Sequence, residues 1–262
     1  MITASKAALA ALLLAGLCLG SIRALAGELT VAAAADLSLA LPPIVSRYQR
    51  QSGNHVRLSF ASSGDFFSQI QNGAPYDVFL SADLGYPQKL AQLGLADAGS
   101  LRTYAVGRLV LWVGRASPLD LQRQGMGALL DPSVHKIAIA NPQFAPYGRA
   151  AVAALRHFGL YDQVAGRLVL GENIGQAAQF AESGNAQIGM IALAHALAPS
   201  VRPRGRYWLV PTDSYPALQQ GVVIISRSNN KTEAAQFLRF LATPESQAVF
   251  RQFGFAAPRE ER

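Results

Sequence analysis

Short apolar runs alternate along the chain with segments in which apolar residues recur every three or four positions. The short runs predict strands, and the longer spacing predicts helices. The predicted strands are Leu29–Ala34, His55–Ala61, Asp77–Ala82, Leu109–Gly114, Lys136–Ala140, Gln187–Ala192, Tyr207–Val210 and Gln220–Ser226. Such alternation is typical of mostly parallel sheets covered by helices on both faces. The pattern therefore predicts an α/β fold.

Helical spacing is clearest in three places. It relates Leu37, Leu41, Ile44 and Tyr48, then Ala151, Leu155 and Phe158, and it continues through Thr232–Leu241 and Pro244–Phe253 near the end. Pro42 and Pro43 interrupt a helix that begins at Leu37, so a short first turn that restarts is expected there. Pro146 predicts a helix start near Tyr147, because proline is favoured in the first helical turn.

Residues 1–26 have the pattern of a secretory signal peptide. Lys6 precedes an apolar stretch from Ala7 to Gly20, and Ala24-Leu25-Ala26 forms a small-x-small cleavage site. Beyond Gly27 no uninterrupted apolar run approaches the roughly 20 residues of a spanning helix. We expect cleavage after Ala26 and export of a soluble product to the periplasm.

Cysteine and charge remove several classes of function. The only cysteine, Cys18, lies inside the leader behind Leu17, which does not fit the small residue that precedes a lipidated cysteine. The mature chain therefore has no disulfide and no thiolate chemistry. Without Lys6 and Arg23 of the leader, 21 basic residues face 16 acidic ones, a net charge of +5. This modest excess does not predict a nucleic-acid partner.

Common catalytic motifs are absent from the sequence. It contains no Gly-x-Ser-x-Gly elbow, no His-Glu-x-x-His and no phosphate loop ending in Gly-Lys-Ser/Thr. Its four histidines lie far apart without ligand spacing. We expect a protein that is not an enzyme; a secreted hydrolase with an unfamiliar motif is the alternative from another class.

Three predicted strands end in small or hydroxyl residues and lead directly into a helix. These junctions are residues 32–36, 59–64 and 140–148. The N-terminus of a helix offers unpaired N–H groups and the positive end of its dipole, so it can bind an anion without a charged side chain. Each junction also has a purely local interpretation, because Asp36 and Ser62 are good N-caps and Tyr147 can serve packing alone.

Five short motifs carry a resemblance to a known family. They are Ala-Ala-Ala-Asp-Leu (33–37), Ser-Phe-Ala-Ser-Ser-Gly (59–64), Gly-Ala-Pro-Tyr-Asp-Val-Phe-Leu-Ser-Ala-Asp (73–83), Ala-Pro-Tyr-Gly (145–148) and Gln-Phe-Gly-Phe (252–255). Together they resemble the periplasmic molybdate-binding proteins of ABC importers, which are type II substrate-binding proteins. The most specific motif is residues 73–83.

The resemblance implies a periplasmic-binding-protein-like fold of two α/β lobes, with the ligand in the cleft between them. By alignment, lobe one is 27–104 plus 217–262, and lobe two is 105–216. The implied ligand is molybdate, with tungstate as a second ligand, and molybdenum enters only as molybdate. The implied partner is an ABC permease in the inner membrane with its cytoplasmic ATPase. No cofactor or free metal ion is implied, and we expect a monomer.

Carried over by position, the oxyanion contacts fall at Asp36, Ser63, Tyr147 and Ile174. Two further positions are Ser62 and Ala192. Some relatives carry a ligand-binding tyrosine at the Ala192 position, where this chain has no phenol, and Tyr147 could replace it because a phenolic O–H is a good donor. Ile174 can contribute only its backbone N–H.

Asp36 departs from the family pattern, since many relatives have a serine there. An ionised carboxylate beside a dianion costs affinity in a dry cleft. One relief is that the carboxylate caps the helix donors near Ser38 or Leu39, leaving the Asp36 N–H for the ligand. The other is that Asp36 accepts a hydrogen bond from a protonated oxyanion, which shifts selectivity toward phosphate- or arsenate-like ligands. The alternative function is therefore a receptor for a different tetrahedral oxyanion, sulfate-, phosphate- or arsenate-like.

Overall fold

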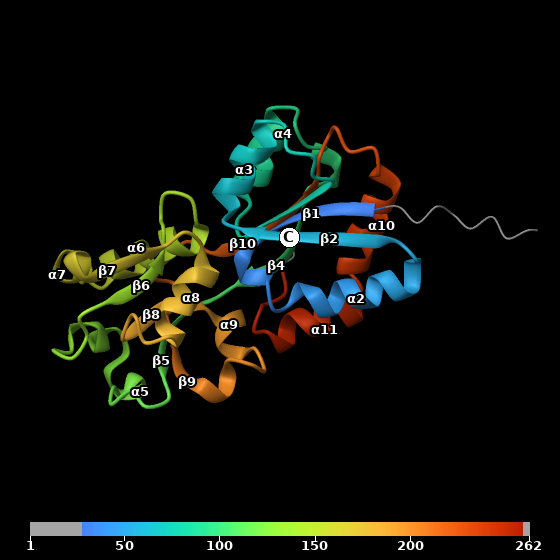
Figure 1. Ribbon diagram of the computed structural model, residues 1–262. Helices are drawn as coiled ribbons and strands as arrows, with labels where there is room; N and C mark the ends of the chain where they lie inside the picture. Colours follow the sequence, from blue (N-terminus) through green and yellow to red (C-terminus); the bar gives the residue numbers. More distant parts are fainter. Residues whose placement is uncertain (1–27, 259–262) are drawn as a thin grey trace, which may run out of the picture.

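The structure, a computed structural model, describes residues 28–258 (Figure 1). The predicted leader and Cys18 lie outside the described residues. Two five-stranded sheets form the centres of two lobes, which lie side by side in Figure 1. No helix formed by residues 28–258 combines the length and the apolar character needed to span a bilayer.

The first sheet has the strand order β2-β1-β3-β10-β4. Its strands are β1 (Glu28–Ala34), β2 (His55–Ala61), β3 (Val78–Ser81), β4 (Arg102–Gly107) and β10 (Leu218–Ile224). The helices of this half, with 3-10 helices labelled η, are η1 (Ala35–Leu37), α2 (Leu41–Ser52), α3 (Ser63–Gln71), α4 (Gly85–Gln92), η2 (Ala98–Ser100), α10 (Lys231–Leu241) and α11 (Pro244–Gln252).

The second sheet has the order β7-β6-β8-β5-β9. Its strands are β5 (Leu109–Gly114), β6 (Ile137–Ala140), β7 (Leu168–Gly171), β8 (Ile188–Ala192) and β9 (Gly205–Leu209). Its helices are α5 (Leu121–Gln124), η3 (Gly125–Leu130), α6 (Pro146–His157), α7 (Tyr161–Val164), η4 (Ala165–Arg167), α8 (Ile174–Glu182), α9 (Leu193–Leu197) and η5 (Arg202–Arg204).

The two-lobe α/β fold with mostly parallel sheets, predicted from the sequence, is confirmed. Each sheet is mixed only because one of its five strands runs against the other four. In the first sheet β1 runs parallel to β2 and β3, whereas β10 is antiparallel to β3 and β4. In the second sheet β6 is parallel to β7 and β8, whereas β5 is antiparallel to β8 and β9. The chain enters the first sheet from the second through β10, and the second sheet from the first through β5. No helix precedes either strand, whereas a parallel connection within one sheet needs a crossover, usually a helix.

The chain passes between the sheets twice. It leaves the first sheet at the end of β4, crosses at Arg108 into β5, and returns from β9 to β10 through residues 210–217. The boundary expected after residue 104 falls inside β4, which pairs with β10 from Arg102 to Gly107. The C-terminal helices return to the first half, where Phe237 of α10 packs edge-on against Tyr48 of α2 with ring centres 5.1 Å apart.

Burial explains which strands the sequence reveals. The interior strands β3 and β6 are buried throughout, and strands covered on both faces are near-continuous apolar runs. All eight predicted strands have counterparts, but β4 and β7 were missed. Both lie at sheet edges, where β4 begins with Arg102 and Thr103 and β7 leaves Leu170 48% exposed. The edge strands β2 and β9 were predicted, so position alone does not hide a strand; β4 and β7 were missed because polar or exposed positions interrupt their short apolar runs.

The interrupted first helix is confirmed. The 3-10 turn η1 ends at Leu37, and α2 starts again at Leu41 with its prolines in the first turn. The predicted helix starts at Tyr147 and in the C-terminal region are confirmed as well, in α6, α10 and α11.

Candidate functional site

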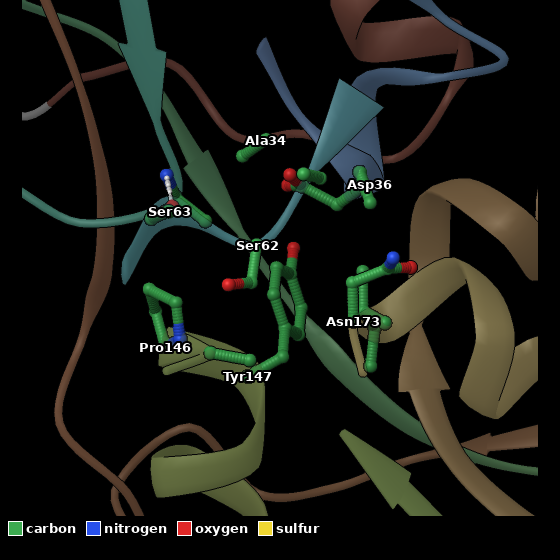
Figure 2. A pocket seen from close by; sticks show the side chains of 12 residues that line it. Ala34, Asp36, Ser62, Ser63, Pro146, Tyr147 and Asn173 are labelled. Atoms are coloured by element: carbon green, nitrogen blue, oxygen red, sulfur yellow. Dashed lines mark hydrogen bonds between the residues drawn. The ribbon is translucent and has the colours of Figure 1, made fainter. Parts of the chain in front are cut away.

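A small hollow between the lobes is lined by the starts of several helices (Figure 2). Residues from the first lobe are Ala34, Ala35, Asp36, Ala61, Ser62, Ser63 and Ala82, and those from the second are Ala145, Pro146, Tyr147, Asn173 and Ile174. The space measures about 200 Å³, including the part open to solvent. The enclosed part of the hollow has room for little more than one water-sized particle, so the hollow fits a small inorganic ion better than an organic ligand.

Helix α3 places two serines with different tasks. The hydroxyl of Ser62 is the N-cap and accepts a hydrogen bond from the Asp65 N–H at 3.1 Å. The hydroxyl of Ser63, which is fully buried, accepts from the Ala82 N–H at 3.0 Å, the dashed line in Figure 2. A hydroxyl that accepts one bond still has its own hydrogen to donate. Ser63 can therefore donate to an anion in the hollow.

The second lobe contributes the starts of α6 and α8. Pro146 occupies the first turn of α6, where its missing N–H costs nothing. Asn173 caps α8, and its Oδ1 accepts from the N–H groups of Gly175 and Gln176 at 2.9 and 3.1 Å. The orphan donors deeper in α8 are thereby satisfied, while Ile174, the first residue of the helix, lines the hollow. Three helices of at least nine residues, α3, α6 and α8, thus begin at one point.

Asp36 is completely buried within η1. Its Oδ2 accepts a hydrogen bond from Gln220 Nε2 at 2.7 Å, and Gln220 Oε1 accepts one from the Tyr104 hydroxyl at 2.8 Å. Its Oδ1 has no partner among the described residues. Burial raises the pKa of Asp36 to about 7, because desolvation disfavours the carboxylate and the Gln220 hydrogen bond offsets this only in part.

The expectation that Asp36 caps its own helix is wrong. Ala34 occupies the N-cap position of η1, and no side chain caps this turn. The carboxyl group instead lies against β10 and β4, because Gln220 offers it a donor in an interior that holds few others. The carboxyl thus faces a neutral amide and phenols, with no ion pair to it in residues 28–258.

Tyr147 approaches this group from the second lobe. Its side chain is 1% exposed, its hydroxyl lacks a hydrogen-bond partner in the described part of the chain, and Figure 2 shows the hydroxyl directed towards Asp36. Burial and the nearby Asp36 carboxyl raise the pKa of Tyr147 well above its usual value. The phenol therefore stays protonated and can donate.

Gly107, at the end of β4, makes room for these groups. A Cβ at this position would lie 2.2 Å from Tyr147 Oη and 2.8 Å from Gln220 Nε2. A Cβ here would force one or both of these side chains to shift, so glycine lets Tyr147 and Gln220 keep their positions beside Asp36.

At the rim the two lobes touch directly. Arg149 Nη2 of α6 lies 2.5 Å from Asp83 Oδ2, and its guanidinium covers the ring of Tyr86 in α4 at 5.3 Å. The Gly64 N–H donates to the carbonyl of Phe144 at 2.9 Å. These contacts hold the hollow in a closed arrangement.

The structure brings together five of the six residues singled out in the sequence: Asp36, Ser62, Ser63, Tyr147 and Ile174. The sixth, Ala192, does not line the hollow, because it ends β8 and pairs there with Leu109 of β5. Sequence reasoning missed Asn173, although an asparagine between a strand and a helical run is a common N-cap. It also missed Gln220, for which a strand position gives no indication.

Within residues 28–258 no group of three or more His, Cys, Asp or Glu side chains is placed to hold a metal ion. His195 is buried on α9, and burial lowers its pKa to about 4, so it is neutral at physiological pH. The hollow offers dipoles and hydroxyl groups instead of a metal-ligand set.

Two lobes joined by two crossings, with helix starts converging on a small hollow between them, define a two-lobed solute-binding protein whose ligand is a small anion. The family model for bacterial extracellular solute-binding proteins matches residues 29–256. The chain belongs to this family.

Named relatives agree with this assignment. The chain is 39% identical over 231 residues to the molybdate-binding protein ModA of Azotobacter vinelandii, an alignment that covers 88% of this chain and 90% of the relative. It is 37% identical to ModA of Rhodobacter capsulatus, with 88% and 89% covered. The solved structure of the Azotobacter vinelandii periplasmic molybdate-binding protein superimposes with a TM-score of 0.84 at 36% identity and covers 88% of this chain and all of that structure.

Proposed function

We propose that this protein is a periplasmic receptor that binds molybdate, and also tungstate, and delivers it to an ABC importer. The observation that carries the proposal is the convergence of the starts of α3, α6 and α8, with the Ser63 and Tyr147 hydroxyls, on a hollow of about 200 Å³. The named function of the relatives supports the choice of anion.

The binding chemistry follows from the donors. A tetrahedral dianion accepts hydrogen bonds from Ser63, Tyr147 and the first-turn N–H groups, including that of Ile174, and each bond to a charged group is worth about 1.5–3 kcal/mol. The helix dipoles add favourable charge at the same point. Because the donors sit on fixed elements, a smaller anion leaves some of them unpaired. Cavity size therefore selects molybdate and tungstate over sulfate.

Binding favours the closed arrangement, because donors of both lobes meet on one ligand. The alignment divides the chain into lobes 27–104 plus 217–262 and 105–216. We propose the same two lobes with the first boundary at Arg108 instead of after residue 104, so that β4 stays whole. The permease in the inner membrane, with its cytoplasmic ATPase, recognises the closed receptor. The receptor acts as a monomer after cleavage behind Ala26, and it carries out binding without catalysis, cofactor or nucleic acid.

The alternative function is a receptor for a different tetrahedral oxyanion, sulfate-, phosphate- or arsenate-like, and Asp36 favours its phosphate- or arsenate-like form. A carboxylate acceptor in the hollow suits an anion that still carries a proton, as phosphate and arsenate do near neutral pH. In this case Asp36→Ser reverses the ranking of phosphate and molybdate. An unchanged ranking contradicts this second candidate.

Calorimetric titration of the purified protein with molybdate, tungstate, sulfate and phosphate tests the proposal. We expect strong binding of molybdate and tungstate and weak or absent binding of sulfate and phosphate. Strong binding of sulfate or phosphate with no heat from molybdate would defeat it.

A further inference from the structure

Asp36 combines three features that a spectator carboxyl group does not need. It lines the hollow, it is completely buried, and its two oxygens are treated unequally. Oδ2 is held by Gln220 at 2.7 Å, and Gln220 is held in turn by Tyr104 at 2.8 Å. Oδ1 is left without any partner within the described residues. Leaving a buried polar atom unpaired is costly. The Tyr147 hydroxyl is directed towards Asp36 and is itself unpaired within the described residues, so an oxyanion between the two groups would satisfy both.

The groups that face Asp36 supply no compensating positive charge. Gln220 of β10 is neutral, and Tyr104 of β4 and Tyr147 of α6 are phenols whose pKa values burial raises well above the usual range. His195, on α9, has its pKa lowered to about 4 by burial. Tyr215, beyond Tyr147, also has a raised pKa. All of these groups are neutral near pH 7.

The remaining elements packed against η1 are β2 and α8. Their ends next to η1 carry no charged side chain, since β2 finishes with Phe60 and Ala61 and the first two turns of α8 are uncharged. The charged residues of these elements lie at the far ends, where Arg57 pairs with Glu28 and Glu182 with Arg204. A dianion entering the hollow would therefore meet an ionised Asp36 with no cation to separate the two.

We propose that Asp36 meets the oxyanion as a neutral carboxylic acid, so that one proton enters the site with each dianion and Oδ1 donates it in a hydrogen bond. This inference rests on the proposed function and names the protonation state in which the site works. The proton comes from water or buffer and joins the carboxylate; no other bond forms or breaks. Gln220, oriented by Tyr104, is a positioning residue that occupies Oδ2 and leaves Oδ1 as the proton-bearing oxygen.

The raised pKa of Asp36, about 7 without ligand, supports this assignment. A bound dianion disfavours the carboxylate further and raises the pKa of Asp36 above that value. Between the two pKa values the free protein is ionised at Asp36 and the complex is not. Binding therefore takes up close to one proton at pH 8.5 and progressively fewer towards pH 6, where Asp36 is already neutral.

Proton uptake is measured directly by calorimetry. The protein without its leader is titrated with molybdate at pH 6, 7, 8 and 8.5. Each titration is run in two buffers of different ionisation enthalpy, because the difference in heat gives the number of protons taken up. We expect an uptake near one proton at pH 8.5, falling towards zero at pH 6, and an affinity that drops about tenfold per pH unit above pH 7. Binding without proton uptake at pH 8.5, and with an affinity that does not change with pH, would overturn the proposal.

Variants identify the group and the role of its neighbours. Asp36→Asn keeps the shape of the side chain but removes the titratable group, so it binds molybdate without proton uptake at any pH. If this variant folds poorly, Asp36→Ser, which also lacks the carboxyl group, gives the same result. Asp83→Asn is the matched control, because Asp83 lies at the rim and pairs with Arg149. It keeps the uptake of wild type. Uptake that persists in both Asp36 variants contradicts the assignment.

Gln220→Met tests the positioning role. It removes the donor to Oδ2, so the carboxylate loses the hydrogen bond that lowers the pKa of Asp36 most, and the midpoint of the uptake curve moves to higher pH. A midpoint that stays in place contradicts the role of Gln220. If no anion binds at any pH, the proposed function fails and this inference fails with it, whereas binding without uptake leaves the proposed function intact.

Discussion

The two lobes present different chemistry to the same hollow. The first lobe contributes polar side chains that are held by hydrogen bonds within that lobe. The Ser63 hydroxyl accepts from the Ala82 N–H, and the Asp36 carboxyl accepts from Gln220 Nε2. The second lobe contributes the starts of α6 and α8 and the phenol of Tyr147, which has no hydrogen-bond partner in the described residues. The difference indicates that the Ser63 hydroxyl and Asp36 Oδ2 are held by their own lobe, whereas the Tyr147 hydroxyl gains a partner only when the second lobe closes on the ligand.

The largest expected effect concerns the titratable group of the first lobe. The pKa of Asp36 is about 7 in the folded protein against an ordinary value of 3.8. Below pH 4 both states are protonated; as the pH rises, the unfolded state releases its proton first, so the free energy of unfolding falls between pH 4 and 7 and levels off above. Asp36→Asn has no titratable group at this position, so its free energy of unfolding does not fall for this reason between pH 4 and 7.

Urea unfolding without ligand measures this difference. We expect Asp36→Asn to gain stability relative to wild type between pH 4.5 and pH 8, by up to about 4 kcal/mol from the roughly three-unit shift. Asp213→Asn is the control, because this carboxyl is exposed in the segment between β9 and β10. If the difference in unfolding free energy between Asp36→Asn and wild type were the same at pH 4.5 and pH 8, Asp36 would already be ionised at pH 4.5 in the folded protein.

Gly64→Ala should separate closure from folding. A Cβ at Gly64 would lie 2.6 Å from the Phe144 carbonyl of the opposite lobe and 2.7 Å from Tyr86 Oη. Overpacking of this kind costs about 1–3 kcal/mol, and only the closed arrangement bears the clash with Phe144. Molybdate affinity should fall about 10- to 100-fold while the thermal unfolding of the free protein changes little.

Gly85→Ala is the matched substitution, since a Cβ there meets nothing nearer than 4.0 Å. It should leave the affinity unchanged. Equal affinities for Gly64→Ala and wild type would indicate that the lobes do not approach at this point when the ligand binds.

Ser63→Ala should weaken molybdate binding by about 1–3 kcal/mol, because one hydrogen bond to a charged ligand is lost. Ser62→Ala makes the sharp comparison. It removes the N-cap of α3 and should cost about 1 kcal/mol of stability, a cost that Ser63→Ala does not carry. The Ser62 hydroxyl accepts from the Asp65 N–H and keeps its own hydrogen, so a loss of affinity in Ser62→Ala would show that it too donates to the anion. Titration calorimetry and denaturant unfolding of both variants separate the two roles, and an unchanged affinity in Ser63→Ala would make Ser63 purely structural.

The smallest effect is expected at the rim. Arg149 and Asp83 join the lobes, but their side chains are 42% and 22% exposed, and exposed ion pairs contribute about 0.2–1 kcal/mol. Arg149→Met should weaken molybdate binding by less than tenfold and reduce its salt dependence. A larger loss would show that the guanidinium reaches the ligand.

The sequence by itself determined the elements and most of the junctions. Interior strands such as β3 and β6 were predictable because burial on both faces requires apolar runs, and the prolines fixed the starts of α2 and α6. The strand-to-helix junctions that hold Ser63 and Tyr147 were found from the order of residues, and the family resemblance then singled out these two as ligand contacts. These are local rules, which depend on neighbours a few positions away.

Only the tertiary structure decided the surroundings of Asp36 and the fate of Ala192. The partner of Asp36, Gln220, lies 184 positions along the chain, and the pairing of β8 with β5 keeps Ala192 out of the hollow. A carboxyl takes its protonation state from burial and from the donors it meets, and these come from segments that the fold brings together. Residue order near Asp36 therefore suggests a helix cap, whereas the packed interior makes the same side chain a buried acid.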